Sequence, residues 1–178
     1  MNTKFVNYAN RGMTLEEDIN HTNEYYLIHD IAVIYKKPTP IKVIKTNYNK
    51  AKINEAYFAT TSTLDYNGIY KGKYIEFDCK ETSSKTSFPL LNIHKHQLNH
   101  IEKILKHGGI CFLIIRFSSL NKTYILMGDK LVSYIEKSSR KSIPISYFED
   151  NCPKIILKYS PRLDYISVID KIINKKGS

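Results

Sequence analysis

Several features that mark other protein classes are missing from this chain of 178 residues. It contains no run of eighteen or more apolar residues, which argues against a membrane-spanning helix, and its first residues lack a signal-peptide pattern. The three cysteines, Cys79, Cys111 and Cys152, are far apart and include no C-x-x-C pair. The sequence therefore suggests neither a disulfide framework nor a zinc site. We expect a cytoplasmic protein with no membrane partner.

Motifs for nucleotide use and for covalent catalysis are also absent. There is no Gly-rich phosphate loop, so ATP use is not indicated, and no serine or cysteine stands in a typical nucleophile context. No internal repeat, low-complexity block or linker divides the chain. The length and a hydrophobic content of 42% fit one domain with a core of its own.

Arginine is scarce, yet the net charge is +10 and the charges are unevenly distributed. The stretch 36–54 is rich in lysine and contains no acid, whereas acidic residues gather in TLEEDI and over 65–81. This arrangement suits a metal-dependent enzyme acting on nucleic acid, because lysines bind phosphates and carboxylates hold a cation. The alternative is a lysine-rich exposed hairpin that only keeps the protein soluble.

The pattern of apolar residues predicts an α/β layout with a mixed sheet. The capping box TLEE begins a helix that ends near His29, and IAVIY (31–35) is expected to be a buried strand. The proline-containing stretch 36–60 is too polar for a core and is expected to protrude as a two-legged arm. Turn signals follow at Asn67-Gly68 and Lys71-Gly72, the second joining two strands into a hairpin.

The second half of the chain continues the same alternation. A helix is expected near 92–106, and ICFLIIRF (110–117) should be the central strand because it is the most hydrophobic run. A strand (TYILM), a short helix (DKLVSYIEK), a basic loop (SRKSIP) and a C-terminal helix (DYISVIDKIIN) complete the prediction.

The segment YIEFDCKET (74–82) raises the question of function. In a strand its apolar residues share one face, and the other face carries Tyr74, Glu76, Asp78 and Lys80. The simplest interpretation is a half-buried strand with a solvated, ion-paired face. However, Asp65 comes thirteen residues before Asp78, and a tight hairpin would bring the two carboxylates together. Lys80 would then lie about 7 Å along the strand from Asp78.

Two carboxylates and a lysine in this arrangement fit phosphodiester hydrolysis. Carboxylates hold Mg²⁺, which keeps most of its waters and polarises the phosphate. A lysine can orient the attacking water and stabilise the charge that develops on the phosphorus oxygens. Asp-(spacer)-[Asp/Glu]-x-Lys is the signature of the PD-(D/E)xK nuclease superfamily, although such triplets also occur by chance.

The surrounding residues make the pattern specific, because nearly the whole chain resembles the RecU Holliday-junction resolvase family. The matching segments, in the family's order, are RGMTLEEDIN, NEYYL, IAVIYKKPTPI, EAYF, DYNGIYKGKYI, KTSFPL, GGICFLII, SRKSIP and PRLDYI. The resemblance implies a single nuclease domain, residues 1–178, with a restriction-endonuclease-like core. It also implies a protruding basic stalk over 36–60 that binds DNA and enters the junction centre.

The resemblance also assigns roles to residues of the site. Asp65 matches a metal-ligating aspartate, Thr63 a threonine of the metal site, and Lys80 the lysine that stabilises the transition state. Gln97 matches a glutamine near the metal, acting through water. Glu16 resembles the acidic residue of an R/K-G-x-x-x-E element.

Asp78 departs from the family pattern, because it stands where the family usually has glutamate. Its carboxylate reaches less far, and Glu76 on the same face is an alternative that would assist the metal. We take Asp78 as the metal ligand.

Candidate DNA contacts lie mostly on the arm. They are Arg11, Lys36, Lys37, Lys45, Lys50, Lys52 and Phe58. Tyr48 and Phe58 are expected to stack on exposed bases, although core packing at the base of the arm is equally open for Phe58. His96 and His100 are four residues apart and could pair on zinc, but no third ligand has suitable spacing.

The predicted function is a Mg²⁺-dependent endonuclease, with Mn²⁺ as a possible substitute, that cuts four-way DNA junctions during recombination and repair. The resemblance implies symmetric paired nicks with 5′-phosphate ends. A C2 homodimer would match the two-fold symmetry of the junction. A RecA-type recombinase or a branch-migration helicase is a further expected partner. The alternatives are a repair or restriction-type nuclease, and a non-catalytic junction-binding or strand-annealing accessory protein.

Overall fold

A six-stranded mixed sheet forms the centre of the computed structural model, which describes residues 14–47, 52–58 and 63–176. The strands lie in the order β1-β4-β5-β7-β8-β10. Their bounds are β1 (Val33–Lys36), β4 (Tyr66–Tyr70), β5 (Lys73–Thr82), β7 (Ile110–Phe117), β8 (Lys122–Met127) and β10 (Lys154–Ile155). Strands β5 and β7 are parallel, and the other neighbours are antiparallel. The predicted α/β class with a mixed sheet is confirmed.

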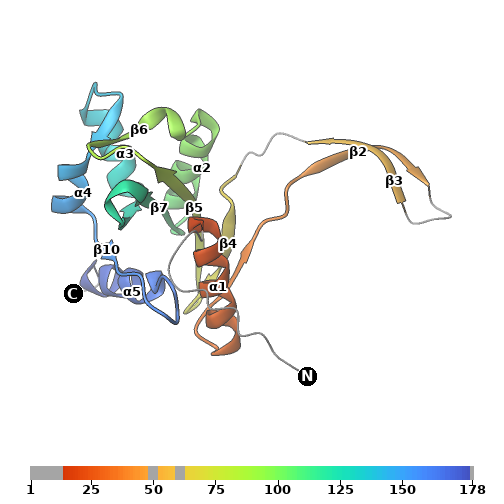
Figure 1. Ribbon diagram of the computed structural model, residues 1–178, viewed down its shortest axis with the longest axis horizontal. Coiled ribbons are helices and arrows are strands. Elements are labelled where there is room, and N and C mark those ends of the chain that lie inside the picture. The colour runs from red at the N-terminus through yellow and green to blue at the C-terminus, as the bar shows by residue number, and fades with distance from the viewer. Residues whose placement is uncertain (1–13, 48–51, 59–62, 177–178) are drawn as a thin grey trace.

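Helices cover both faces of this sheet (Figure 1). One face packs against α1 (Leu15–Ile28) and α5 (Tyr165–Lys176), and the other against α2 (Lys95–Lys106), α3 (Gly128–Lys137) and α4 (Ile145–Asn151). The remaining short elements are η2 (Leu90–Asn92), η3 (Ser118–Leu120), and the small pair β6 (Ser87–Pro89) and β9 (Ser142–Pro144). The predicted basic loop SRKSIP therefore contains a strand, β9, which pairs with β6.

Strand β7 is the central strand, as its hydrophobicity predicted. All of its residues except Arg116 are buried. On the neighbouring strand the ring of Phe77 stacks on Tyr66 and on Phe112, with centroids 4.9 and 4.8 Å apart. Large aromatic rings packed in this way contribute much of a core's burial, so they fix β4, β5 and β7 in one register.

The β4–β5 hairpin has the predicted two-residue turn. Lys71 and Gly72 have φ values of 46° and 74°, the left-handed conformations that a type I′ turn requires. The other predicted turn, Asn67-Gly68, is wrong, because both residues lie inside β4. Gly68 instead allows a close approach: a Cβ there would lie 2.0 Å from the carbonyl oxygen of Val33.

Strand β1 was predicted to be buried, and this is wrong. It forms the edge of the sheet next to β4, and only Ile34 of its four residues is buried. An edge strand packs one face on the core and leaves the other open, which explains the exposed side chain of Tyr35.

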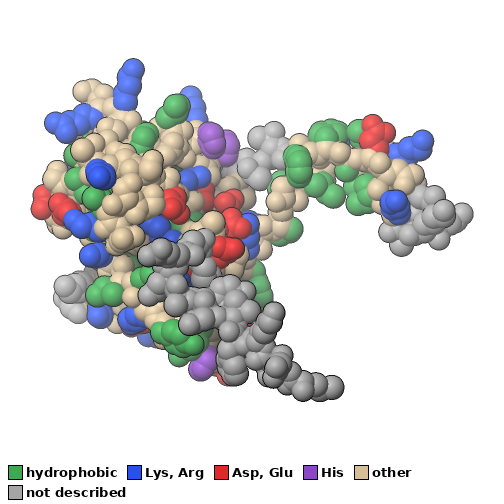
Figure 2. Space-filling view, in the orientation of Figure 1, with side chains coloured by type: hydrophobic (Ala, Val, Ile, Leu, Met, Phe, Trp, Pro, Cys, Tyr) green, Lys and Arg blue, Asp and Glu red, His purple; other side chains and the backbone are tan. Residues whose placement is uncertain are grey.

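The arm is a separate two-stranded sheet of β2 (Ile41–Asn47) and β3 (Lys52–Phe58). It projects away from the body (Figure 1), and every residue of β3 is exposed. Figure 2 shows hydrophobic side chains along this hairpin and lysines toward its far end. Among the described residues, no helix is long and apolar enough to cross a membrane.

Candidate active site

The hairpin brings Asp65 and Asp78 together. Tyr66 pairs with Phe77, so the residue before one and the residue after the other lie opposite each other. Partial burial raises the pKa of Asp65, and the adjacent charge of Asp78, with a hydrogen bond between the two carboxyls, raises it further. A divalent cation bound between the two carboxyls would favour the charged form of both.

Asp78 is fully buried and held by three donors. Its Oδ2 accepts hydrogen bonds from Gln97 Nε2 at 2.6 Å and from Lys80 Nζ at 2.9 Å. Its Oδ1 accepts from the amide of Cys79 at 2.7 Å. The structure thus brings Asp65, Asp78, Lys80 and Gln97 together, and the shorter side chain of Asp78 is fixed where Lys80 reaches it.

Gln97 is oriented by the start of helix α2. Its Oε1 accepts a hydrogen bond from the backbone of His94 at 3.2 Å, so its Nε2 points toward Asp78. This reciprocal capping pattern positions the side chain before any cation arrives. In this geometry Gln97 acts on Asp78, and its predicted part in holding the metal stays a prediction.

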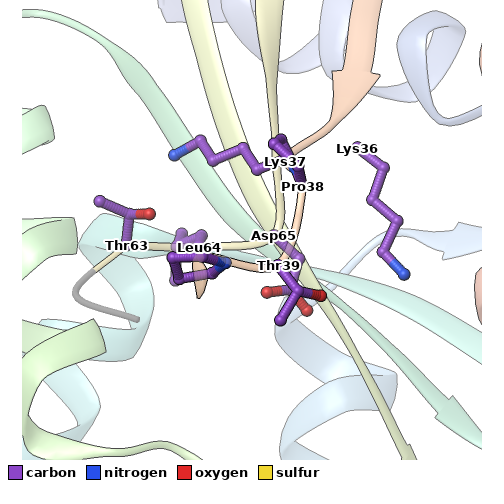
Figure 3. Close-up of a pocket in the computed structure, with 8 residues that line it drawn as sticks. Lys36, Lys37, Pro38, Thr39, Thr63, Leu64 and Asp65 are labelled. Carbon is purple, nitrogen blue, oxygen red and sulfur yellow. The ribbon is translucent and has the colours of Figure 1, made fainter. Parts of the chain in front are cut away.

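A pocket of about 160 Å³ opens at the base of the arm beside Asp65 (Figure 3). It is lined by Lys36, Lys37, Pro38, Thr39, Pro40, Thr63, Leu64 and Asp65. Lys36 and Lys37 point in opposite directions, as neighbours in an extended chain do (Figure 3). Lys36 forms an ion pair with Glu16 and lowers the pKa of Asp65 against the larger opposing effects.

Thr63 and Glu16 lie in the same region of the molecule as Asp65. Thr63 lines the same pocket as Asp65. The charge of Glu16 is close enough to raise the pKa of Tyr66, after the larger effects of burial and of Cys79. Their predicted parts in the metal site stay predictions.

Glu76, the alternative that would assist the metal, is held by hydrogen bonds from other groups. It is fully buried, and its donors are Lys37 Nζ, His100 Nε2 at 2.9 Å, Tyr74 OH at 2.8 Å and the Leu64 amide at 3.3 Å. Burial alone would raise the pKa of Glu76, but the hydrogen bonds from Lys37, Tyr74 and His100 lower it overall.

Sequence reasoning missed this cluster as a unit. Alternation placed Glu76 on the face of Asp78, but Lys37 lies 39 residues away and His100 lies 24 residues away. Contacts between residues so far apart in the chain leave no local pattern from which they could be predicted. Among the described residues, His96 and His100 belong to no group of three or more side chains that could hold zinc.

The predicted DNA contacts differ in their exposure and in their partners. Lys45 and Lys52 are exposed on the arm, whereas the ammonium of Lys37 faces the buried Glu76. Phe58 is 79% exposed, so it does not pack in a core at the base of the arm and remains available for stacking. Arg11, Lys50 and Tyr48 lie outside the described residues.

The donor set fits a hard cation with few protein ligands. In the described part of the chain, no group of three or more His, Cys, Asp or Glu side chains could hold a metal ion. Zinc would need such a set, whereas Mg²⁺ is usually bound by one or two carboxylates and keeps several waters. Asp65 and Asp78 match the second pattern.

Comparison with known proteins gives one consistent family. The family model described as RecU, recombination protein U, matches residues 10–171. A protein of Geobacillus sp. (strain WCH70) named "Holliday junction resolvase RecU" is 55% identical over 172 residues, covering 93% of this chain and 86% of the relative. The Bacillus subtilis (strain 168) protein of the same name is 52% identical and covers 93% of this chain and 82% of its own.

Proposed function

Since the chain belongs to the RecU family, we propose that it is a structure-specific endonuclease that resolves Holliday junctions. The observation that carries this proposal is the group formed by Asp65, Asp78 and Lys80 at the base of a projecting hairpin. The pairing of carboxylates and lysine suits hydrolysis of a phosphodiester, and the hairpin suits a branched substrate.

In the proposed mechanism Asp65 and Asp78 hold Mg²⁺, or Mn²⁺ in its place. When bound, such an ion polarises the phosphate and makes a coordinated water more acidic. Asp78 stays in place through Gln97 and the Cys79 amide. Lys80, whose Nζ lies 2.9 Å from Oδ2 of Asp78, orients the attacking water and neutralises charge on the phosphate oxygens. The products carry 5′-phosphate ends.

The arm would select the junction. Lys45 and Lys52 bind phosphates of the DNA arms, and the exposed ring of Phe58 stacks on an unpaired base. A homodimer presents two such sites to a two-fold symmetric substrate and makes paired nicks. Cutting of Holliday junctions belongs to recombination and DNA repair, where a recombinase or a branch-migration helicase would supply the junction.

A cleavage assay tests the proposal. Wild type and Asp78→Asn are incubated in Mg²⁺ with a labelled four-way junction and with a linear duplex of the same sequence. We expect symmetric nicks in the junction only, and their loss in Asp78→Asn. Cutting of both substrates would indicate a repair or restriction-type nuclease. Tight binding of the junction without cutting in Mg²⁺ or Mn²⁺ would indicate a junction-binding accessory protein.

A further inference from the structure

The cluster around Glu76 joins parts of the chain that are distant in sequence. Glu76 is fully buried on β5, two residues before Asp78. A buried carboxylate is costly unless it is paired and hydrogen-bonded, and here both of its oxygens have donors. The cluster is therefore a built structure and not an incidental surface ion pair.

Two of the donors flank the arm. Lys37 precedes strand β2 and Leu64 follows strand β3, and both bond the same oxygen of Glu76. The backbone amide of Lys37 also donates to the carbonyl of Asp65 at 2.7 Å. The position of Asp65 is thus fixed from both sides of the arm through contacts that converge on Glu76.

A third donor comes from the helix that carries Gln97. His100 and Gln97 are three residues apart on α2 and share a face of the helix. They contact Glu76 and Asp78, which are two residues apart and share a face of β5. Helix α2 is therefore joined to the catalytic strand at two matched points.

We propose that Glu76 is a positioning residue for cleavage: it holds the base of the arm and helix α2 on β5, so that Asp65 and Gln97 face Asp78. This inference rests on the proposed nuclease function. It also assigns the ammonium of Lys37 to the buried Glu76 instead of to a DNA phosphate.

The change Glu76→Gln tests this role because it keeps the size of the side chain and removes its charge. The ammonium of Lys37 would lose its ion-pair partner, and an amide offers one acceptor oxygen where the carboxylate offered two. Lys37→Met is a second variant, since its side chain is partly exposed and its loss is less disruptive. Glu102→Gln is the control, as Glu102 is exposed on α2.

Three measurements separate positioning from DNA binding and from folding. They are single-turnover cleavage with enzyme in excess, junction binding in EDTA, and hydrogen exchange of the Leu64 amide. We expect Glu76→Gln and Lys37→Met to slow cleavage by roughly 10- to 100-fold, the range known for groups that orient metal ligands. Junction binding should be unchanged, and the Leu64 amide should exchange faster. Glu102→Gln should match wild type in all three.

Other outcomes would overturn the inference. Weaker binding and a salt slope reduced by about one for Lys37→Met, with normal cleavage of the bound junction, would make Lys37 a phosphate contact. Unchanged exchange at Leu64 in both variants would show that Glu76 does not hold the arm. If Glu76→Gln does not fold, Lys37→Met decides. If wild type fails to cut any junction, the proposed function fails, and the exchange measurement alone decides the role of Glu76.

Discussion

At the scale of single residues, two buried carboxylates on β5 are fixed in position by their hydrogen-bond partners. Asp78 has three donors, and Glu76, two residues earlier, has four, of which three come from other segments. The two side chains share a face of β5 but have different surroundings. Alternation of residues therefore identifies the face, and only the partners distinguish the proposed metal ligand, Asp78, from the proposed positioning residue, Glu76.

A third acidic residue, Asp164, has a structural role that depends on pH. It directly precedes α5, and its carboxylate accepts hydrogen bonds from Tyr26 OH at 3.0 Å and Ser167 Oγ at 2.7 Å. Burial opposes the charged form, but hydrogen bonds from Ser167, Tyr26 and Lys158 hold the pKa of Asp164 below its usual value.

Because the folded protein lowers this pKa, the carboxylate of Asp164 stabilises the fold near neutral pH and loses that contribution as pH falls through the lowered pKa. We expect Asp164→Asn to unfold at lower urea than wild type at neutral pH. The gap should shrink on the acid side. Urea titrations at several pH values measure it, and a gap that widens on acidification would contradict this account.

At the scale of elements, the β4–β5 hairpin could be predicted, and its contact with β1 could not. The turn at Lys71-Gly72 depends on the conformations of those two residues alone, so it can be predicted from the sequence. Asn67-Gly68 has the same kind of turn signal but lies inside β4. Gly68 is needed there because it packs closely against the backbone of Val33 on the neighbouring strand β1. The arm was predictable for a similar reason, since its polarity and prolines are local features. The partners of Glu76 are not.

The contact at Gly68 gives a test of this packing. A methyl group there would overlap the carbonyl oxygen of Val33, and backbone cannot move aside as a flexible side chain does. We expect Gly68→Ala to lower the free energy of unfolding by about 1–3 kcal/mol, the usual cost of overpacking. Lys73→Ala, exposed on the same hairpin, should stay within about 0.5 kcal/mol. Equal stabilities in urea would show that β1 moves freely.

The arm should govern affinity and leave the chemistry unchanged. Lys45 and Lys52 are exposed on its two strands, so each can neutralise a phosphate. Replacing both with glutamine should reduce the slope of log K against log salt by about one for each lost phosphate contact. The rate of cutting at saturating enzyme should not change. Lys154→Gln, at the opposite edge of the sheet, is the control.

At the scale of the whole molecule, a two-fold symmetric substrate fits an enzyme made of two copies of the chain. Each protomer of the proposed homodimer has its own Asp65, Asp78 and Lys80, so each would cut one strand. Mixed dimers of wild type and Asp78→Asn, isolated through two different tags, should nick only one of the two opposed strands. Paired cuts by mixed dimers would mean that one site serves both strands.

Family membership follows from the length of the match, whereas the roles of individual residues need the three-dimensional site. Asp65, Asp78, Lys80 and Gln97 were named from sequence, and the fold brings them together because β4 pairs with β5 and α2 crosses between β5 and β7. The ion pair of Lys37 with Glu76 could not be predicted from the sequence, because it depends on how the base of the arm packs against the body.

Asp65 and Asp78 are proposed to hold a divalent cation between them. Calorimetric titration of Mg²⁺ and Mn²⁺ into the wild type, Asp65→Asn, Asp78→Asn and the surface control Glu102→Gln tests it most directly. We predict binding in wild type and in the control, weakened by at least roughly tenfold in each aspartate variant. Equal binding in all four proteins, or no binding in any of them, would contradict it.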